Sequence, residues 1–403
     1  MSKSNETTPN VPTLRFKNYD DNYREITLKD VCTLITKGTT PAKFSTNGIN
    51  FIKIDSLNGN YVDNSKVTHI NESIHNTLLS RSILKENDIL LAIAGATVGK
   101  HCIIQKSNLP ANTNQALAII RLNKHLLPYY LLAFFDTNYL PAYIKLICAA
   151  SAQPNLNLQQ VGRIKLNIPT IQEQEKVCYF IQLLDKRISV QNKIISDLKV
   201  LKKELCRKLF NSSHCDKTIE IRQVADIYGG YAFNSKAYIS DGKYKIVTIG
   251  NVTGDKYISG DYNRIDILPD NIQEQQILNN GDILISLTGN VGRISIVDGD
   301  NYLLNQRVAK LNVKNNLIKA YIYQYLSNSS FEKDMSNAGQ GAAQKNIKNE
   351  DILSYNIRIP TNQTYLEKID GLLSTYDKLI ADEERFLLNL NLQKSFLLNA
   401  MFI

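Results

Sequence analysis

Two short glycine motifs are the first candidates for chemistry in this sequence. GATVGK at Gly95–Lys100 ends in lysine, as a phosphate-binding loop does, and GNVGR at Gly289–Arg293 is its counterpart. A P-loop needs four residues between its glycines and a Ser or Thr after the lysine. Here three residues separate the glycines, and His101 follows Lys100. We therefore predict turns between strands, which leave Lys100 and Arg293 available to a phosphate group.

Two further loops combine glycine with hydroxyl groups, lysine and, in one of them, aromatic rings. They are TKGTTPAK at 36–43 and YGGYAFNSK at 228–236. Such loops suit phosphate positioning and groove contact on a nucleic acid. Surface lysines beside glycine turns are also common in proteins of any function, and that alternative stays open. The candidate nucleic-acid contacts from these loops are Lys37, Thr39, Thr40, Lys43, Tyr231 and Lys236.

Side-chain amides form a third group of candidates, because Asn and Gln can pair with base edges. They follow small-residue runs in AASAQPNL (149–156) and GQGAAQKNI (339–347). Each run contains one asparagine, Asn155 in the first and Asn346 in the second, and we assign both mainly to packing and helix capping. A buried hydrogen-bonding role is an equal alternative for Asn114-Gln115 and Asn305-Gln306-Arg307. The remaining nucleic-acid candidates are Asn114, Gln115, Ser151, Gln153, Arg307, Gln340, Gln344 and Lys345.

Metal and disulfide chemistry are disfavoured. The six cysteines, from Cys32 to Cys215, show no CxxC spacing, and the five histidines form no HExxH pair. The first residues, MSKSNETTPN, are polar, and no apolar run approaches the roughly 20 residues that span a bilayer. We therefore expect no metal, no membrane segment and a cytoplasmic location.

The net charge is +9, from 47 Lys and Arg against 38 Asp and Glu, which fits a polyanion binder but also many ordinary basic proteins. Residues 171–210 carry nine basic and five acidic side chains (+4), and 361–403 carry four and six (−2). The other residues therefore carry +7, since 9 − (4 − 2) = 7. The basic excess lies mainly outside these two segments.

The sequence repeats itself once. NDILLAIAGATVGK from Asn87 matches GDILISLTGNVGR from Gly281, an offset of about 194 residues. AQPNL from Ala152 matches AQKNI from Ala343, and LNIP ending at Pro169 matches IRIP ending at Pro360. Matches in one order indicate a tandem duplication, and a solenoid would need shorter and more numerous repeats.

Each repeat begins with short β-rich runs, continues with a helical patch such as 127–147, and ends in helical heptads after a proline. The predicted class is mixed α/β, with two similar globular domains and two long helices. We expect an N-terminal arm (1–24), a first domain (25–170), a first helix (171–212), a second domain (213–360) and a second helix (361–403).

The heptads define a sustained apolar seam in each long helix. Of ten positions spaced by four and three residues, eight are apolar in each helix, and the polar exceptions Gln191 with Glu383 and Lys202 with Lys394 match. Such a seam predicts a coiled coil. The expected interface residues are Val177, Ile181, Leu184, Ile188, Gln191, Ile195 and Leu198 in the first helix, and Ile369, Leu373, Tyr376, Ile380, Glu383, Leu387 and Leu390 in the second.

We expect the two helices to pair antiparallel about a pseudo-two-fold axis, with Gln191 meeting Glu383 near the midpoints. The alternative is that each helix packs on its own globular domain or on another chain. A helix of 30 to 40 residues spans about 45–60 Å, which exceeds one DNA turn of about 34 Å. Two related basic domains on such a spacer could contact two unlike DNA half-sites across an unread gap.

The order of these motifs resembles the specificity subunits of type I restriction-modification enzymes over nearly the whole chain. The resemblance rests on the GATVGK hairpin, the NQ pair, the QxN[IL] segment, the xxIP exit, Glu173-Gln174 and LKKELCRKLF at 201–210, and on their recurrence up to Phe402. PTLRF at Pro12–Phe16 resembles the leader of many members. One departure is Asn362-Gln363 with Tyr365-Leu366-Glu367 where the family usually has an EQ pair, which affects only local capping or partner contact.

The resemblance implies a non-catalytic chain that binds double-stranded DNA and no cofactor. Two modification subunits would bring S-adenosylmethionine to methylate adenine, and two restriction subunits would bring ATP and Mg²⁺. The sequence agrees, because no NPPY-type methyltransferase motif and no GxGxxG are present. The alternatives are a coiled-coil scaffold that binds no DNA and a catalytic methyltransferase or nuclease. A steep salt dependence of DNA binding would argue against the first, and activity of the isolated chain would support the second.

Overall fold

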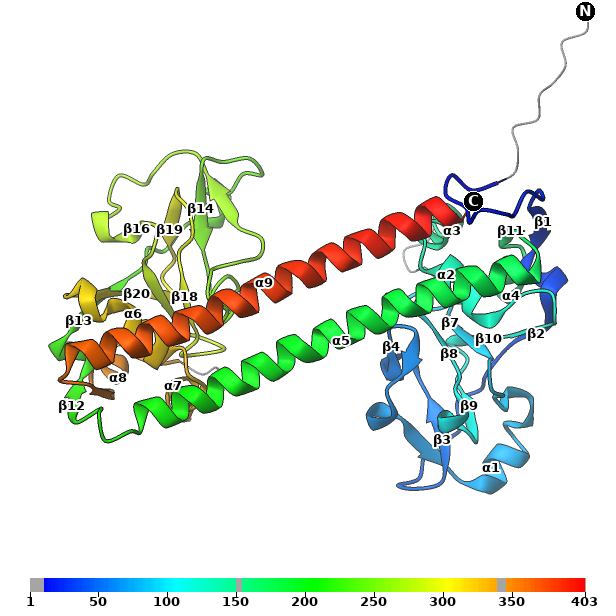
Figure 1. The fold of residues 1–403 in the computed structure, drawn as a ribbon, viewed down its shortest axis with the longest axis horizontal. Coiled ribbons are helices and arrows are strands. Elements are labelled where there is room, and N and C mark those ends of the chain that lie inside the picture. The colour runs from blue at the N-terminus through cyan, green and yellow to red at the C-terminus, as the bar shows by residue number, and fades with distance from the viewer. Residues whose placement is uncertain (1–10, 150–153, 339–345, 403) are drawn as a thin grey trace, which may run out of the picture. The chain divides into compact units, whose positions relative to one another are not determined.

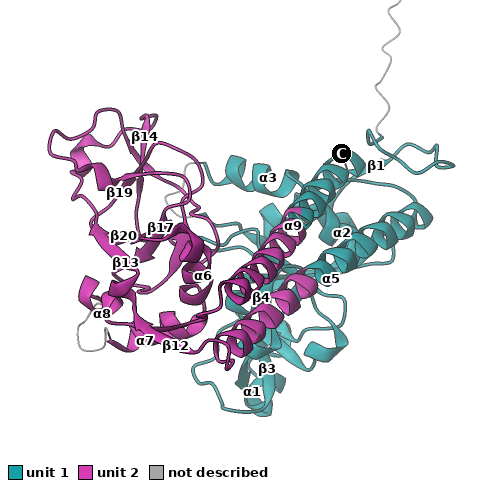
Figure 2. Cartoon of the chain, turned by 60° about the vertical axis from the view of Figure 1, so that its left-hand side comes forward, with its two compact units in different colours: residues 1–191, 386–403 teal, residues 192–385 magenta. Residues whose placement is uncertain are grey.

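A computed structural model describes residues 11–149, 154–338 and 346–402 of the chain (Figure 1). The chain divides into two compact units (Figure 2). Unit 1 comprises 1–191 and 386–403, and unit 2 comprises 192–385. Each long helix therefore contributes one part to each unit.

Unit 1 is built on a four-stranded antiparallel sheet of order β2-β10-β7-β8. A second sheet has the order β6-β3-β9. Strand β1 pairs with β11, which directly precedes the first long helix. The strands are β1 (Arg24–Thr27), β2 (Cys32–Lys37), β3 (Ile49–Ile52), β4 (Leu57–Asn58), β5 (Tyr61–Val62), β6 (Thr68–Ile70), β7 (Ile89–Ala92), β8 (His101–Ile103), β9 (Ala111–Thr113), β10 (Leu117–Leu122) and β11 (Lys165–Ile168); the helices are α1 (Glu72–Asn76), α2 (Pro128–Phe135), α3 (Tyr139–Ile147) and α4 (Leu158–Gly162).

Unit 2 repeats this plan with a four-stranded sheet of order β13-β20-β17-β18 and a second sheet of order β15-β14-β19-β16. The strands are β12 (Lys217–Glu220), β13 (Ala225–Gly229), β14 (Tyr244–Val247), β15 (Asn263–Ile265), β16 (Ile277–Leu278), β17 (Ile283–Ser286), β18 (Ile294–Ile296), β19 (Tyr302–Leu304), β20 (Val308–Val313) and β21 (Asn356–Ile359); the helices are α6 (Asn316–Leu326), α7 (Ser329–Ala338) and α8 (Asn349–Leu353). The long helices are α5 (Ile171–Phe210) and α9 (Gln363–Met401).

The predicted duplication and mixed α/β class are confirmed by this topology. The main sheets have corresponding strand orders, β3 pairs in parallel with β9 as β14 does with β19, and β12 pairs with β21 as β1 does with β11. The helical patch expected at 127–147 is two helices, because α2 ends at Phe135 and α3 begins at Tyr139.

The heptad residues are buried or partly buried throughout both long helices. In unit 1, Val177 and Ile181 of α5 share one core cluster with Leu398 and Met401 of α9. In unit 2, Cys206 and Phe210 near the end of α5 share a cluster with residues near the start of α9. The beginning of one helix thus lies beside the end of the other in each unit, which confirms the antiparallel pairing.

The same clusters contain residues of the globular part. Tyr130 of α2 belongs to the core with Val177, and Tyr321 of α6 belongs to the core with Phe210. Each helix therefore packs on the other helix and also on a globular domain. The expected contact of Gln191 with Glu383 joins residues of different units and stays a prediction.

The polar heptad residue Lys394 anchors α9 in unit 1. Its Nζ lies 2.7 Å from Asp185 of α5 and 3.2 Å from Asp136 at the end of α2. Asp136 also accepts a hydrogen bond from Asn60 and contacts the His101 ring. Burial alone would raise the pKa of Asp136, but the bond from His101 and the charge of Lys394 hold it at about 2.

Lys202 occupies the matching place in unit 2. Its ammonium group forms an ion pair with Asp377 of α9, which accepts a second bond from the Gln324 amide at 2.6 Å. The two lysines among the polar exceptions to the heptads thus each pair with a carboxylate on the opposite helix. A buried charged pair of this kind favours one register of two helices over a shifted one.

The Glu173-Gln174 pair fastens the start of α5 to unit 1. Glu173 accepts two bonds of 2.8 Å from Arg15 of the N-terminal arm and one of 2.9 Å from Tyr23. Gln174 accepts from the Leu127 backbone. In unit 2 the α9 start is instead capped by Asn362, whose side chain accepts from the Tyr365 backbone at 3.1 Å. The EQ pair thus ties α5 to other segments of unit 1, whereas Asn362 caps the start of α9.

No helix in the described part of the chain is long and apolar enough to cross a membrane.

We predict that Asp136→Asn destabilises unit 1 by about 2 kcal/mol at neutral pH. The folded state holds the pKa of this carboxyl group at about 2, below its ordinary value of 3.8. The carboxylate therefore stabilises the fold above about pH 4, and this contribution is lost as the pH falls toward 2. Thermal unfolding followed by circular dichroism at pH 7 and pH 3 measures both effects. The difference from wild type should be largest at pH 7 and fall to about half at pH 3, which is still above the folded-state pKa of about 2.

Asp55→Asn is the control, because Asp55 is an exposed carboxylate of the same unit. Its unfolding midpoint should follow that of wild type at both pH values. Equal losses for Asp136→Asn at both pH values would show that the charge of Asp136 is not the stabilising feature.

Candidate nucleic-acid interface

In unit 1 the structure brings the first glycine loop against the Asn114-Gln115 turn. The Gly38 backbone donates to Asn114 O at 3.1 Å, and the Thr40 hydroxyl lies 2.5 Å from Gln115 Oε1. A Cβ at Gly38 would lie 1.8 Å from Thr113 O, so only glycine permits this approach. Residues that are about 75 positions apart in sequence thereby form one surface.

Unit 2 has a corresponding junction with different backbone bonds and side chains. Tyr231 donates its backbone N–H to Leu304 O at 2.8 Å, and Gln306 donates to Tyr231 O at 3.0 Å. A Cβ at Gly230 would lie 2.1 Å from Asn305 O. The Tyr231 ring packs against Phe233 with ring centroids 4.9 Å apart, and its hydroxyl donates to Asn271.

The two asparagines of these turns have a structural role. Asn114 Oδ1 accepts from the Ala116 backbone at 3.1 Å, and Asn305 Oδ1 accepts from the Arg307 backbone at 3.3 Å. These bonds shape the turn and leave the next side chains, Gln115, Gln306 and Arg307, exposed. The asparagines thus use their Oδ1 atoms within the turns, whereas Gln115, Gln306 and Arg307 face the solvent.

The expectation that Asn155 and Asn346 cap helices is wrong. Asn155 forms a β-bridge with Ala94, and Asn346 forms one with Thr288. The cap of α4 is Asn157, which accepts from the Gln160 backbone at 2.8 Å, and α8 begins after Lys348. Asn155 and Asn346 are each in extended chain that pairs with the glycine hairpin of its unit, so the N-caps of α4 and α8 lie two residues later, at Asn157 and Lys348. Local capping signals in the sequence do not reveal this shift.

The bridge at Asn155 completes a hollow beside the glycine loop of unit 1. Its volume is about 540 Å³, and it is lined by Lys37, Gln115, Asn155, Asn157 and Gln159 together with apolar residues. Three segments that the sequence singled out separately meet here. Asn157 and Gln159 are not among the residues predicted from the sequence, although both belong to the amide-rich run after Leu156.

The GATVGK and GNVGR motifs are confirmed as turns between strands. They connect β7 with β8 and β17 with β18, with positive φ at Gly95, Gly99, Gly289 and Gly292. Lys100 is exposed in the first turn. Arg293 in the second lies 3.2 Å from Glu332 of α7, so its charge already has a protein partner.

The other predicted contacts are distributed as follows. Thr39, Lys43 and Lys236 are exposed on the glycine loops. Ser151, Gln153, Gln340, Gln344 and Lys345 lie outside the described residues. Residues 11–149, 154–338 and 346–402 contain no group of three or more His, Cys, Asp or Glu side chains that could hold a metal ion.

The close approach at Gly230 makes a specific prediction. Gly230→Ala should destabilise unit 2 by about 1–3 kcal/mol, because the added methyl group forces the loop away from Asn305. Gly229→Ala is the matched control, since a Cβ there meets no atom within 4 Å. Thermal unfolding measures both variants, and equal stability would show that the loop can move aside without cost.

Comparisons with known proteins agree with this architecture. The family model of the type I restriction modification DNA specificity domain matches twice, at residues 20–200 and 217–390. The MjaVIII type I restriction enzyme specificity subunit of Methanocaldococcus jannaschii is 25% identical over 305 residues, which are 69% of each chain. The putative MjaX specificity subunit of that organism is 23% identical over 351 residues, covering 83% of this chain and 82% of the relative.

Solved structures share the fold. A chain from a study of complex assembly and conformational transition of the type I R-M system has a TM-score of 0.59 at 15% identity, covering 95% of this chain and 98% of its own. The S subunit of the M. genitalium type I system has a TM-score of 0.53 at 14% identity, covering 98% of this chain and 99% of its own. With both repeats matched by the family model, the chain belongs to the DNA specificity subunits of type I restriction-modification systems, which are non-catalytic.

Proposed function

We propose that this chain binds an asymmetric bipartite DNA target and directs adenine methylation and restriction by partner subunits. Each half-site is assigned to one target-recognition domain, residues 25–170 or 213–360. The carrying observation is the repeated junction of a glycine loop with an amide turn, at Gly38 with Asn114 and at Gly230 with Asn305.

The two junctions share the close approach of a glycine to the asparagine turn and differ in their backbone bonds and surface side chains. Unit 1 presents Lys37, Thr40 and Gln115, whereas unit 2 presents Tyr231 and Arg307. Lysine and hydroxyl groups position a duplex through its phosphates, while Gln and Arg can form paired bonds to base edges. A common scaffold with unlike side chains supports two unlike half-sites.

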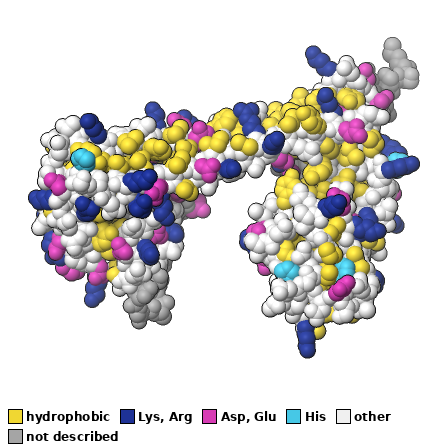
Figure 3. Space-filling view, turned by 60° about the horizontal axis from the view of Figure 1, so that its bottom comes forward, with side chains coloured by type: hydrophobic (Ala, Val, Ile, Leu, Met, Phe, Trp, Pro, Cys, Tyr) yellow, Lys and Arg dark blue, Asp and Glu magenta, His cyan; other side chains and the backbone are white. Residues whose placement is uncertain are grey.

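We further propose that two modification subunits carrying S-adenosylmethionine and two restriction subunits using ATP and Mg²⁺ assemble with this chain. Apolar side chains left exposed on the long helices support protein docking there (Figure 3). In unit 1 they include Leu183, Val190, Leu388, Leu392 and Phe396, and in unit 2 Ile194, Leu201, Leu372 and Leu379. Native mass spectrometry of the complex co-expressed with its cognate subunits measures the stoichiometry.

The half-site assignment predicts that Arg307→Ala relaxes the specificity of one half-site and leaves the other intact. Loss of a paired base contact costs about 1–3 kcal/mol of discrimination. Methylome sequencing of cells that carry the assembled system identifies the modified motif. Lys217→Ala, which removes an exposed charge on β12, should leave the motif unchanged. Simultaneous change of both half-sites would contradict the assignment of one domain to one half-site.

A second prediction concerns the gap between the half-sites. Because α5 and α9 pair within both units, an insertion must be made in both helices to preserve their register. Four residues after Gln191 and four after Glu383 should lengthen the helices by about 6 Å with little rotation. The methylated motif should keep both half-sites and gain one or two unspecified base pairs, at about 3.4 Å per pair.

Two inserted residues at each position provide the control, because they rotate the helix by about 200° and should abolish methylation. An active four-residue variant with an unchanged gap would show that the helices do not set the spacing.

A further inference from the structure

Unit 1 contains a second hollow next to the one beside the glycine loop. It has a volume of about 610 Å³ and is lined by residues of β2 and α4. Leu158 and Gln159 line both hollows, so the two form one groove, which we name the β2 groove. Strand β2 is an edge strand of the main sheet and runs along this groove from Cys32 to Lys37.

The charged side chains that line the β2 groove are all basic. Lys29 and Arg163 line the hollow between β2 and α4, and Lys37 lines the hollow beside the glycine loop. All three are exposed, and none has a carboxylate within ion-pair distance in the part of the chain that the structure describes. Asp30, the residue after Lys29, does not line the groove, and its carboxylate accepts bonds from Thr27.

Lys29 and Arg163 lie next to each other at one end of the groove. The Leu28 N–H donates to Ile164 O at 2.8 Å, which continues the antiparallel pairing of β1 with β11 and sets the next residues, Lys29 and Arg163, opposite each other. A Cβ at Gly162 would lie 3.5 Å from Lys29 Cβ, so the Lys29 stem lies against the residue before Arg163. Like charges on opposite residues repel each other, and an anion bound at both removes this repulsion.

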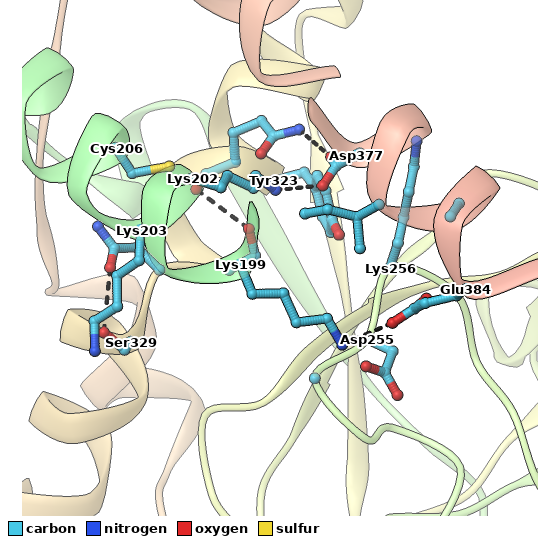
Figure 4. Close-up of a pocket in the computed structure, with 16 residues that line it drawn as sticks. Lys199, Lys202, Lys203, Cys206, Asp255, Lys256, Tyr323, Ser329, Asp377 and Glu384 are labelled. Atoms are coloured by element: carbon cyan, nitrogen blue, oxygen red, sulfur yellow. Dashed lines mark hydrogen bonds and ion pairs between the residues drawn. The ribbon is translucent and has the colours of Figure 1, made fainter. Parts of the chain in front are cut away.

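A cavity of unit 2 between α5 and α9 shows a different arrangement of lysines. There Lys199 lies 2.7 Å from Glu384, and Lys202 forms an ion pair with Asp377 (Figure 4). The charge of these two lysines is therefore neutralised within the protein. The lining of the β2 groove has no Asp or Glu among the described residues, so its positive charge is available to an external anion.

The lining of the β2 groove can be matched with unit 2 through the duplication. The strand registers correspond, and the bond of Leu28 with Ile164 recurs as the bond of Ile221 with Tyr355. The charged residues at the matched positions of unit 2 are Glu220, Arg222, Asp226, Lys348 and Glu350, in place of Thr27, Lys29, Leu34, Asn157 and Gln159, and Gly229 and Ser354 replace Lys37 and Arg163. The lining thus has three basic and no acidic residues in unit 1, but two basic and three acidic residues in unit 2.

The acidic residues of the matched surface in unit 2 hold nearby basic groups. Arg222 forms ion pairs with both Glu220 and Glu350. Lys314, just outside the matched positions, lies 3.1 Å from Asp226. A surface that neutralises its own charges in this way attracts a polyanion only weakly. The unneutralised basic groove is therefore a feature of unit 1.

We propose that the β2 groove binds the phosphate backbone of DNA beside the half-site of unit 1 and that unit 2 makes no equivalent contact. This inference rests on the DNA binding proposed above. Lys37 lies at the end of the groove that contains Gln115, and the pair of Lys29 and Arg163 lies at the other end. These contacts strengthen binding and carry no sequence information, because every nucleotide has the same phosphate group.

The length of the groove favours a polymer of phosphates over a single small anion. The six residues of β2 extend over about 17 Å at about 3.4 Å per residue. One strand of a DNA duplex carries a phosphate about every 3.4 Å along the axis, so a duplex lying along β2 presents about five of them. One small anion cannot contact both Lys37 and the pair of Lys29 and Arg163.

The salt dependence of DNA binding tests this inference. The methyltransferase assembled from this chain and its cognate modification subunits is titrated with fluorescent duplexes with and without the methylated motif, at several salt concentrations. The double variant Lys29→Ala, Arg163→Ala should lower the slope of log affinity against log salt by about two in magnitude. At about 0.1 M salt it should bind both duplexes at least about tenfold more weakly, and its methylated motif should be unchanged.

The matched control is Arg222→Ala, Lys348→Ala, which removes the two basic residues at the equivalent positions of unit 2. Its salt slope should equal that of wild type. Without DNA, the thermal unfolding midpoint of the Lys29→Ala, Arg163→Ala enzyme should equal or exceed that of wild type, because two neighbouring cations have been removed. A lower midpoint together with weaker binding would assign the effect to the fold and contradict a direct phosphate contact.

Three further outcomes distinguish this inference from the proposed function. A wild-type slope in a Lys29→Ala, Arg163→Ala enzyme that still methylates its motif would overturn the phosphate contact and leave the proposed function intact. Binding of a poly-glutamate peptide that depends on Lys29 and Arg163, with the DNA slope unchanged, would overturn it in favour of an acidic protein partner. A wild-type enzyme that binds neither duplex would contradict the proposed function itself.

Discussion

Pairing of α5 with α9 is the constraint on which each unit depends. The core of unit 1 is completed by Leu398, Met401 and Phe402 near the chain's C-terminus, and that of unit 2 by residues at the end of α5. The core of unit 1 cannot close on its local sequence alone, because residues 386–403 cover part of its apolar surface, whereas unit 2 is the continuous segment 192–385 and contains both of its helix parts. Folding of both units is therefore coupled to helix pairing.

Charged groups within this apolar seam make the pairing specific. Burying Lys202 and Lys394 is costly unless each meets a carboxylate, and each meets one at a single register of the two helices. Leucine at these positions would tolerate a shifted alignment. The seam thus combines non-directional burial, which supplies most of the stabilisation, with two ion pairs that select the alignment.

Between the two copies of the duplication, the features that hold each unit together are retained and the side chains on its surface differ. The strand orders, the glycine junctions and the helix ion pairs recur in both units, whereas the surface residues beside Gly38 and Gly230 differ. Divergence of the surface alters possible DNA contacts without disturbing the core. The helix–domain contacts have diverged too, since Asp136 after α2 pairs with Lys394 in unit 1, whereas Ser327 follows α6 at the matching place in unit 2.

By itself the sequence determined the duplication, the α/β class, the paired helices and the glycine turns, because each depends on periodicity or on a local backbone requirement. It also marked Lys37 and Gln115 as candidate contacts and Asn155 as a structural residue, but in three unrelated segments. Only the tertiary structure decided that these line one hollow, that Asn155 extends a hairpin instead of capping a helix, and that Arg293 is held by Glu332. The physical reason is that such contacts join residues distant in sequence, and their geometry follows from how the whole unit packs.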